Sequence, residues 1–172
     1  MTAGNGKANA EAQVRALIDD QAKAIRAKHV DGSVSSYAPD VLLFDVVNPL
    51  QTTGSDAARA RLEEWFASFQ GPIGYELRDL SIAAGDDVAF SHSLSRVSAT
   101  TTDGRKLDMW WRTTVCYRKV DGVWTVTHEH PRCLSMSRAV EPRGTSSRSR
   151  RDAPSGQRHP HEEGWSDGNW KR

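Results

Sequence analysis

Two histidines at alternate positions of one segment are the first candidates for chemistry in this sequence. The segment from Val123 to His130 is rich in β-branched residues and follows an Asp-Gly pair, which predicts a strand after a tight turn. Because side chains alternate between the two faces of a strand, His128 and His130 share a face with Trp124, and Glu129 points the other way. An apolar stripe that ends in two imidazoles predicts a core-facing strand whose far end lines a cavity.

A third candidate is an acidic residue inside an apolar run. Asp45 interrupts residues 41–47, whose otherwise continuous apolar character is typical of a strand buried on both faces. Burial favours the protonated carboxyl group, which suits a general base that works near neutral pH. Asp45 could remove a proton next to a carbonyl group, with His128 or His130 as the hydrogen-bond donor. The alternative is that Asp45 simply pairs with an arginine or a histidine.

The same side chains could also bind a metal ion. His128, His130 and either His92 or Asp45 would supply three ligands and leave one position open. A His-x-His pair is a weak metal signal by itself, and hydrogen-bonded histidines that line a pocket are the simpler interpretation. We therefore expect no metal and no other cofactor.

The order of the elements predicts an α+β fold. Apolar residues at helical spacing predict a helix at about 10–28, a short helix that begins near Asp31, and a third helix with Ser55 as its N-cap. Strands are expected at 75–83, 88–99, 107–119 and 123–130, joined by turns that contain Gly85-Asp86, Asp103-Gly104 and Asp121-Gly122. This order predicts helices packed on one side of a curved antiparallel sheet.

The turns also predict how the strands face each other. Two-residue loops at Asp103-Gly104 and Asp121-Gly122 would place Val115 opposite both His92 and His128. The face expected to line the core carries Phe90, His92, Leu94, Trp111, Thr113, Val115, Tyr117, His128 and His130. The opposite face carries small hydroxyl residues such as Ser91, Ser93 and Ser95, and is expected to form a two-fold contact between copies of the chain.

Length and composition predict one domain with a tail. We expect a polar lead-in at 1–9, a folded domain at 10–136, and a disordered, basic, Ser/Arg-rich tail at 137–172. The net charge of +1 gives no argument for a nucleic acid or membrane partner. No apolar run reaches the roughly 18 residues of a membrane span. With two cysteines the chain is too poor in cysteine for a disulfide framework, so a cytoplasmic protein is expected.

Several short motifs accompany this order of elements. They are Tyr37-Ala38-Pro39-Asp40, Phe44-Asp45, the helix start Gly54-Ser55-Asp56, and the segment 122–130. Together they resemble the SnoaL-like branch of the NTF2-like superfamily, to which ketosteroid isomerases and polyketide cyclases belong. The resemblance covers roughly residues 10–130. It implies a cone formed by a curved antiparallel sheet, with three N-terminal helices packed on its concave face around a pocket.

The resemblance also implies roles for individual residues. Asp45 aligns with the general base of ketosteroid isomerases, whereas Gln21 and Thr113 stand near the positions of the tyrosine and the protonated acid of their oxyanion hole. The catalytic candidates are Asp45, His128 and His130, and the residues expected to line the pocket are Gln21, Tyr37, Phe44, His92, Trp111 and Thr113.

These residues predict a homodimer that binds a small apolar or carbonyl-containing ligand. Its chemistry would be cofactor-free acid–base catalysis of the isomerase or cyclase type next to a carbonyl group. The alternative is a non-catalytic module for ligand binding or dimerisation.

Overall fold

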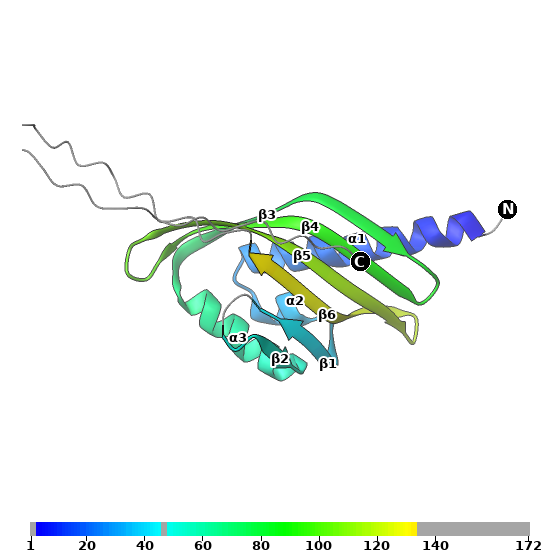
Figure 1. The fold of residues 1–172 in the computed structure, drawn as a ribbon, viewed down its shortest axis with the longest axis horizontal. Helices are drawn as coiled ribbons and strands as arrows, with labels where there is room; N and C mark the ends of the chain where they lie inside the picture. Colours follow the sequence, from blue (N-terminus) through cyan, green and yellow to red (C-terminus); the bar gives the residue numbers. More distant parts are fainter. Residues whose placement is uncertain (1–2, 46–47, 134–172) are drawn as a thin grey trace, which may run out of the picture. The chain divides into compact units, whose positions relative to one another are not determined.

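The structure, a computed structural model, describes residues 3–45 and 48–133, and the predicted tail at 137–172 lies outside them. The elements in chain order (Figure 1) are α1 (Ala3–Arg26), α2 (Val30–Val34), β1 (Tyr37–Phe44), β2 (Gln51–Thr53), α3 (Ser55–Ala67), β3 (Phe69–Ala84), β4 (Val88–Thr101), β5 (Lys106–Val120) and β6 (Val123–Cys133). The predicted α+β class, with N-terminal helices and a curved sheet, is confirmed. Within the described ranges, no helix has the length and apolar character needed to cross a membrane.

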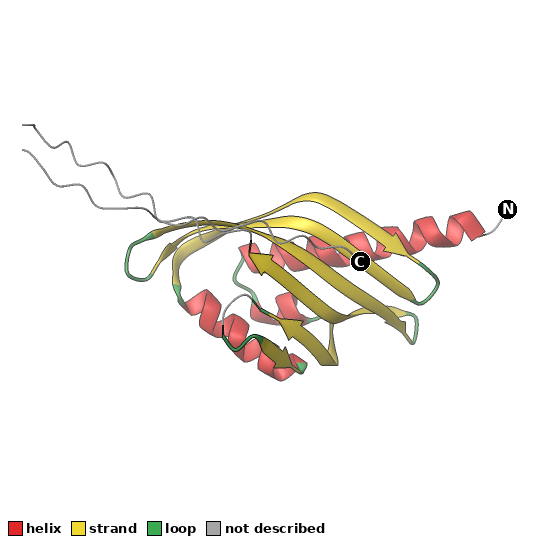
Figure 2. Cartoon of the chain, viewed as in Figure 1, coloured by secondary structure: helices red, strands yellow, loops and turns green. Residues whose placement is uncertain are grey.

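Six strands form one sheet in the order β2-β1-β6-β5-β4-β3. The last four strands form the predicted antiparallel meander, and Figure 2 shows them as long, curved neighbours. β1 runs parallel to β6 and antiparallel to the short strand β2, which the sequence did not predict. The first long strand of the chain therefore lies beside the last.

α1 packs on one face of the sheet, against β3 and β6, and we call this face the inner face. Val14 and Ile18 lie about one helical turn apart, are buried, and join Tyr117 of β5 in the main hydrophobic core. The helix begins at Ala3 and not near Ala10. The added residues 3–9 include two glycines and two asparagines, which have low helix propensity, so intrinsic propensity does not account for the longer helix.

α3 lies against β1 and β2 at the other end of the sheet. Gly54 has a φ of 93°, a conformation that favours glycine, and precedes the helix as its N-cap. The predicted N-cap, Ser55, is therefore the first helical residue. A second core cluster joins the C-terminal end of α3 to β3 and β4, and its buried members are Phe66, Phe69, Ile73 and Val97.

The predicted pairing of β4 with β5 is wrong by one residue. The last pair is Thr100 with Lys106, so five residues, 101–105, separate the two members of this pair, and Asp103-Gly104 sits inside this longer connection. Ser91, not His92, is opposite Val115. Because a shift of one residue turns a strand over, the serines of β4 face α1 and His92 faces outward. The face predicted to contact a second copy is therefore covered on β4.

The pairing of β5 with β6 begins as predicted and then shifts. Asp121 and Gly122 both have positive φ, as a two-residue type I′ turn requires, and Tyr117 pairs with Val126. The next pair is Cys116 with His128, which leaves Thr127 as an extra residue in a β-bulge. From this bulge onward β6 is turned over relative to the prediction.

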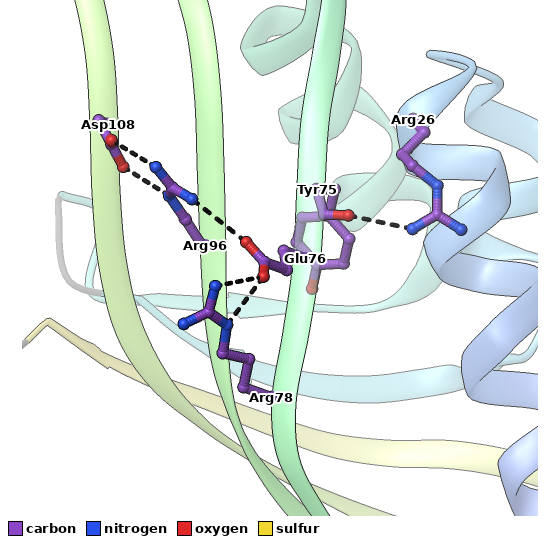
Figure 3. Close-up of polar contacts among 6 residues, drawn as sticks. All are labelled: Arg26, Tyr75, Glu76, Arg78, Arg96 and Asp108. Carbon is purple, nitrogen blue, oxygen red and sulfur yellow. Dashed lines mark hydrogen bonds and ion pairs between the residues drawn. The ribbon is translucent and has the colours of Figure 1, made fainter.

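Polar contacts on both sides of β3 hold it in place (Figure 3). On the outer face, opposite α1, Glu76 accepts a hydrogen bond from Arg96 (3.3 Å), and Arg96 donates two more to Asp108 (2.7 and 2.8 Å). At the adjacent residue, Arg26 of α1 donates to the backbone carbonyl of Tyr75 (3.0 Å). Neighbouring strand residues face opposite ways, so this arrangement directs the Tyr75 ring inward.

Candidate active site

A cavity lies between α1 and the inner face of the sheet. Its volume is about 30 Å³. Gln21 contributes from α1, Ser93 and Thr113 from the centre of the sheet, and Glu129 from β6. Among the described residues that line this cavity, Glu129 is the only carboxylate.

Glu129 is held at the cavity by a short chain of hydrogen bonds. The Tyr37 hydroxyl donates to Glu129 Oε2 at 2.8 Å, and Gln21 Nε2 donates to the Tyr37 oxygen at 3.4 Å and to the Ser33 carbonyl at 3.2 Å. Burial raises the pKa of the Glu129 carboxyl above its ordinary value, and the nearby Asp45 charge adds to this effect, whereas the Tyr37 bond opposes it. A carboxyl group with a raised pKa can take up and release a proton closer to neutral pH.

Three tyrosines surround this carboxylate. Burial raises the pKa of Tyr37, Tyr75 and Tyr117, and the Glu129 charge adds to the shift in each case. All three phenols therefore stay protonated and remain hydrogen-bond donors at neutral pH. The site combines one proton-transfer group with neutral donors, as stabilisation of a developing oxyanion requires.

The two histidines do not line this cavity. Because Thr127 bulges, Glu129 pairs with Val115 on the inner face, and His128 and His130 lie on the outer face. His128 Nδ1 is 2.7 Å from the Leu42 carbonyl and donates to it, and both rings pack edge-on against Phe44, with centroids 4.9 and 5.4 Å away. The predicted facing of His128, His130 and Glu129 is wrong, and the catalytic role of the histidines stays a prediction.

Asp45 occupies different surroundings from those predicted. It follows β1, is partly exposed, and accepts hydrogen bonds from Arg61 Nε (2.8 Å) and Nη2 (2.5 Å) in α3. Arg61 also lines an open groove of about 430 Å³ between β2 and α3. Asp45 is thus one half of an ion pair outside the inner cavity, as in the alternative stated above, and its role as general base stays a prediction.

The other predicted pocket residues divide between the two faces. Gln21 and Thr113 line the cavity, and Tyr37 hydrogen-bonds two of its lining residues. Trp111 faces inward but packs on the second core cluster, with its ring 6.1 Å from that of Tyr75. Phe44 and His92 lie on the outer face. Neither Phe44 nor Trp111 therefore lines the cavity, whose aromatic lining residues are Tyr75 and Tyr117.

The described residues bring no three histidine, cysteine or carboxylate side chains close enough to hold a metal ion. His92, His128 and His130 all lie on the outer face but do not converge on one metal position. Asp45 is paired with Arg61. This arrangement does not fit the ligand set that the sequence permitted.

Sequence analysis missed Glu129 as a cavity residue. Strand alternation placed it outward, and nothing in the segment 123–130 marks Thr127 as the bulged position. The sequence of β4 did contain a sign of the cavity wall, because small serines alternate there with the larger Phe90, His92 and Leu94. A face of small hydroxyl residues suits a cavity wall beneath a helix as well as a contact between copies.

Comparison with known proteins gives a family match and many similar folds. The model of a family described as SnoaL-like domain matches residues 14–135. An NTF2-like protein of unknown function from Pseudomonas putida is 34% identical, with a TM-score of 0.66 over 73% of this chain and 87% of that chain. No significant match is found among the curated proteins.

More distant structures show the same fold. A ketosteroid isomerase-like protein from Erwinia carotovora is 18% identical, with a TM-score of 0.63 over 73% of this chain and 96% of that chain. An uncharacterised protein with a cystatin-like fold from Caulobacter vibrioides is also 18% identical, with a TM-score of 0.64 over 74% and 91% of the two chains. At this level of identity the likeness concerns architecture only.

Proposed function

The chain belongs to the SnoaL-like family of NTF2-like proteins, and on this basis we propose that it binds a small carbonyl compound and moves a proton within it. The reaction would be cofactor-free acid–base chemistry of the isomerase or cyclase type, with Glu129 as the proton carrier. The observation that supports this proposal is the Glu129 carboxylate on the inner cavity, hydrogen-bonded by Tyr37 at 2.8 Å and with its pKa raised by burial.

The proposed reaction has two proton transfers. The Glu129 carboxylate takes a proton from the carbon next to the carbonyl group, and the electron pair of that C–H bond forms the C=C bond of an enolate. The displaced carbonyl electrons collect on oxygen, where a neutral donor such as Tyr75 or Thr113 hydrogen-bonds the negative charge. Glu129 then returns the proton to carbon, either to the original position or, where a further C=C bond is conjugated with the enolate, to the far carbon of that conjugated system, and the carboxylate is regenerated.

Exchange of carbon-bound hydrogen tests this proposal without a known substrate. A panel of small ketones is incubated with the full-length protein in deuterated water, and loss of the proton signal next to the carbonyl is followed by NMR. We expect the protein to accelerate exchange for at least one ketone, and Glu129→Gln to lower that rate by about 10²–10⁴-fold. Glu63→Gln, at an exposed position of α3, is the matched control. Equal rates for the wild type and Glu129→Gln would remove Glu129 from the reaction.

A non-catalytic binding or dimerisation module is the second candidate, and the outer face of the sheet favours a dimer. Phe90, near the start of β4 on this face, is 49% exposed and lies opposite Cys116. Two arginines further along this face are partly neutralised, because Arg78 and Arg96 both contact Glu76. We propose that two copies pack through this outer face about a two-fold axis.

A further inference from the structure

The sheet side of the inner cavity is a row of hydroxyl groups. Ser91, Ser93 and Ser95 occupy alternate positions of β4 and therefore all face α1. Ser91 and Ser95 are 3% and 0% exposed. An apolar ligand would find little matching surface on this wall, because most side chains that β4 contributes to the cavity are polar.

The outer members of the row are already paired with other hydroxyls. Ser91 Oγ lies 2.9 Å from the Tyr117 hydroxyl, and Ser95 Oγ lies 2.8 Å from Thr113 Oγ1. One hydrogen bond between two hydroxyls uses only one of their two protons. These pairs fix the side chains in position, so that the wall is preorganised before a ligand arrives.

Ser93 differs from its two neighbours. It lies between them on the cavity wall and, within the described part of the chain, its hydroxyl hydrogen-bonds no other protein group. Both its proton and its lone pairs are therefore available to a ligand. Across the sheet, Ser93 pairs with Thr113, and Thr113 pairs with Pro131, two residues beyond Glu129. Ser93 and Glu129 thus face the same cavity from strands roughly 10 Å apart.

We infer that the ligand of this cavity carries a second oxygen atom besides its carbonyl group, and that Ser93 selects for it by a hydrogen bond. The substrate class is a short hydroxy-ketone: Glu129 acts on the carbon next to the carbonyl, and the hydroxyl group of the ligand binds Ser93. The small volume of about 30 Å³ favours a compound of few atoms. This inference rests on the proposed function and narrows its substrate.

Two probes of equal size test the inference. Hydroxyacetone and 2-butanone have the same number of non-hydrogen atoms and differ only in that a hydroxyl replaces a methyl group. Dissociation constants are measured by NMR titration of the full-length protein over roughly 1–50 mM, the range suited to such small ligands. We expect hydroxyacetone to bind about fivefold more tightly than 2-butanone, the value of one net hydrogen bond.

The variant Ser93→Ala should abolish this preference and leave the affinity for 2-butanone unchanged. Because the Ser93 hydroxyl has no protein partner to lose, the melting temperature should stay the same, whereas a structural role would lower it. Ser81→Ala, at an exposed position of β3 on the outer face, is the matched control and should behave like the wild type.

Three results would overturn the inference: equal binding of the two probes, a preference that survives Ser93→Ala, or no binding of either probe. Failure of the proposed function has a different signature. In that case hydroxyacetone would still bind in preference to 2-butanone, but neither the wild type nor Glu129→Gln would accelerate hydrogen exchange.

Discussion

At the scale of single residues, the position of a titratable group decides its chemistry more than its type does. The chain offers histidines and aspartates that look suited to proton transfer, yet His128 is engaged by the Leu42 carbonyl and Asp45 by Arg61. Glu129 instead shares a cavity with tyrosines and serines. Burial there disfavours its charged form, and the single Tyr37 hydrogen bond only partly compensates.

This imbalance makes the protein's stability depend on the ionisation of Glu129. Its pKa is raised in the folded state, so the folded protein binds the proton more tightly than the unfolded chain, and ionisation of Glu129 disfavours folding. We expect Glu129→Gln to be more stable than the wild type at neutral pH. This difference in stability should shrink as the pH falls. It should vanish below pH 4.5, the ordinary pKa of the carboxyl group, where Glu129 is neutral in both the folded and the unfolded protein.

Thermal unfolding of both proteins across this pH range checks the expectation. Comparing the two proteins at each pH cancels the titration of the groups that do not interact with Glu129. A stability difference that stays constant with pH would mean that Glu129 has the same pKa in the folded and unfolded states.

At the scale of elements, the sequence predicts the type and the order of the helices and strands well, but it predicts poorly which face of a strand points inward. The spacing of Val14 and Ile18 reveals the packed side of α1, and Asp121-Gly122 correctly predicts a two-residue turn. These are local properties, set by periodicity and by the conformations that each residue tolerates. The residues that line the inner cavity could not be predicted from local patterns. Which face of a strand lines the cavity depends on the length of the connection before it and on the position of any β-bulge.

Two single-residue irregularities change the lining of the site. Relative to the prediction, the five-residue connection between Thr100 and Lys106 turns β4 over and brings Ser91, Ser93 and Ser95 inward. The bulge at Thr127 likewise turns the end of β6 over and brings Glu129 inward. Each shift exchanges one complete face of a strand for the other. The predicted pocket residues that remain at the cavity, Gln21, Tyr37 and Thr113, come from elements that neither irregularity affects.

Deletion of single residues tests the position of the bulge. Removal of Thr127 should remove the bulge and preserve both flanking pairs, Tyr117 with Val126 and Cys116 with His128. Removal of Thr125 would also regularise the strand, but it would turn Val126, now 1% exposed, toward the outer face. We expect the Thr127 deletion to be the more stable of the two by about 1.5–3 kcal/mol, the value of burying one such side chain.

Urea unfolding of the two deletion variants measures this difference. The Thr127 variant should also retain proton exchange that depends on Glu129, because its carboxylate stays on the inner face. Equal stabilities, or a more stable Thr125 variant, would place the extra residue elsewhere in β6.

At the scale of the whole molecule, the two faces of the sheet have separate tasks. The described inner face carries the cavity beneath α1, and the outer face presents Phe90 among histidines and an ion-paired ladder. Val88 and Phe90, at alternate positions of β4, share this face and are 51% and 49% exposed, and a patch of neighbouring exposed apolar side chains is typical of an interaction surface. Adjacent residues of a strand point to opposite faces, so Phe90 can be substituted on the outer face while Ser91 stays in the cavity wall.

This separation leads to the expectation for the dimer. Phe90→Asp would place a buried charge in each half of a two-fold contact, twice per dimer, because such a contact uses the same residues from both copies. We expect light scattering to show a wild-type mass of twice the 19.0 kDa chain and a Phe90→Asp mass of one chain. Leu50→Asp, at a position that is 61% exposed outside the outer face, is the control and should remain dimeric. The monomeric variant should keep its Glu129-dependent hydrogen exchange, because Phe90 faces away from the cavity. A wild-type protein that is already monomeric would contradict the proposed dimer contact through the outer face.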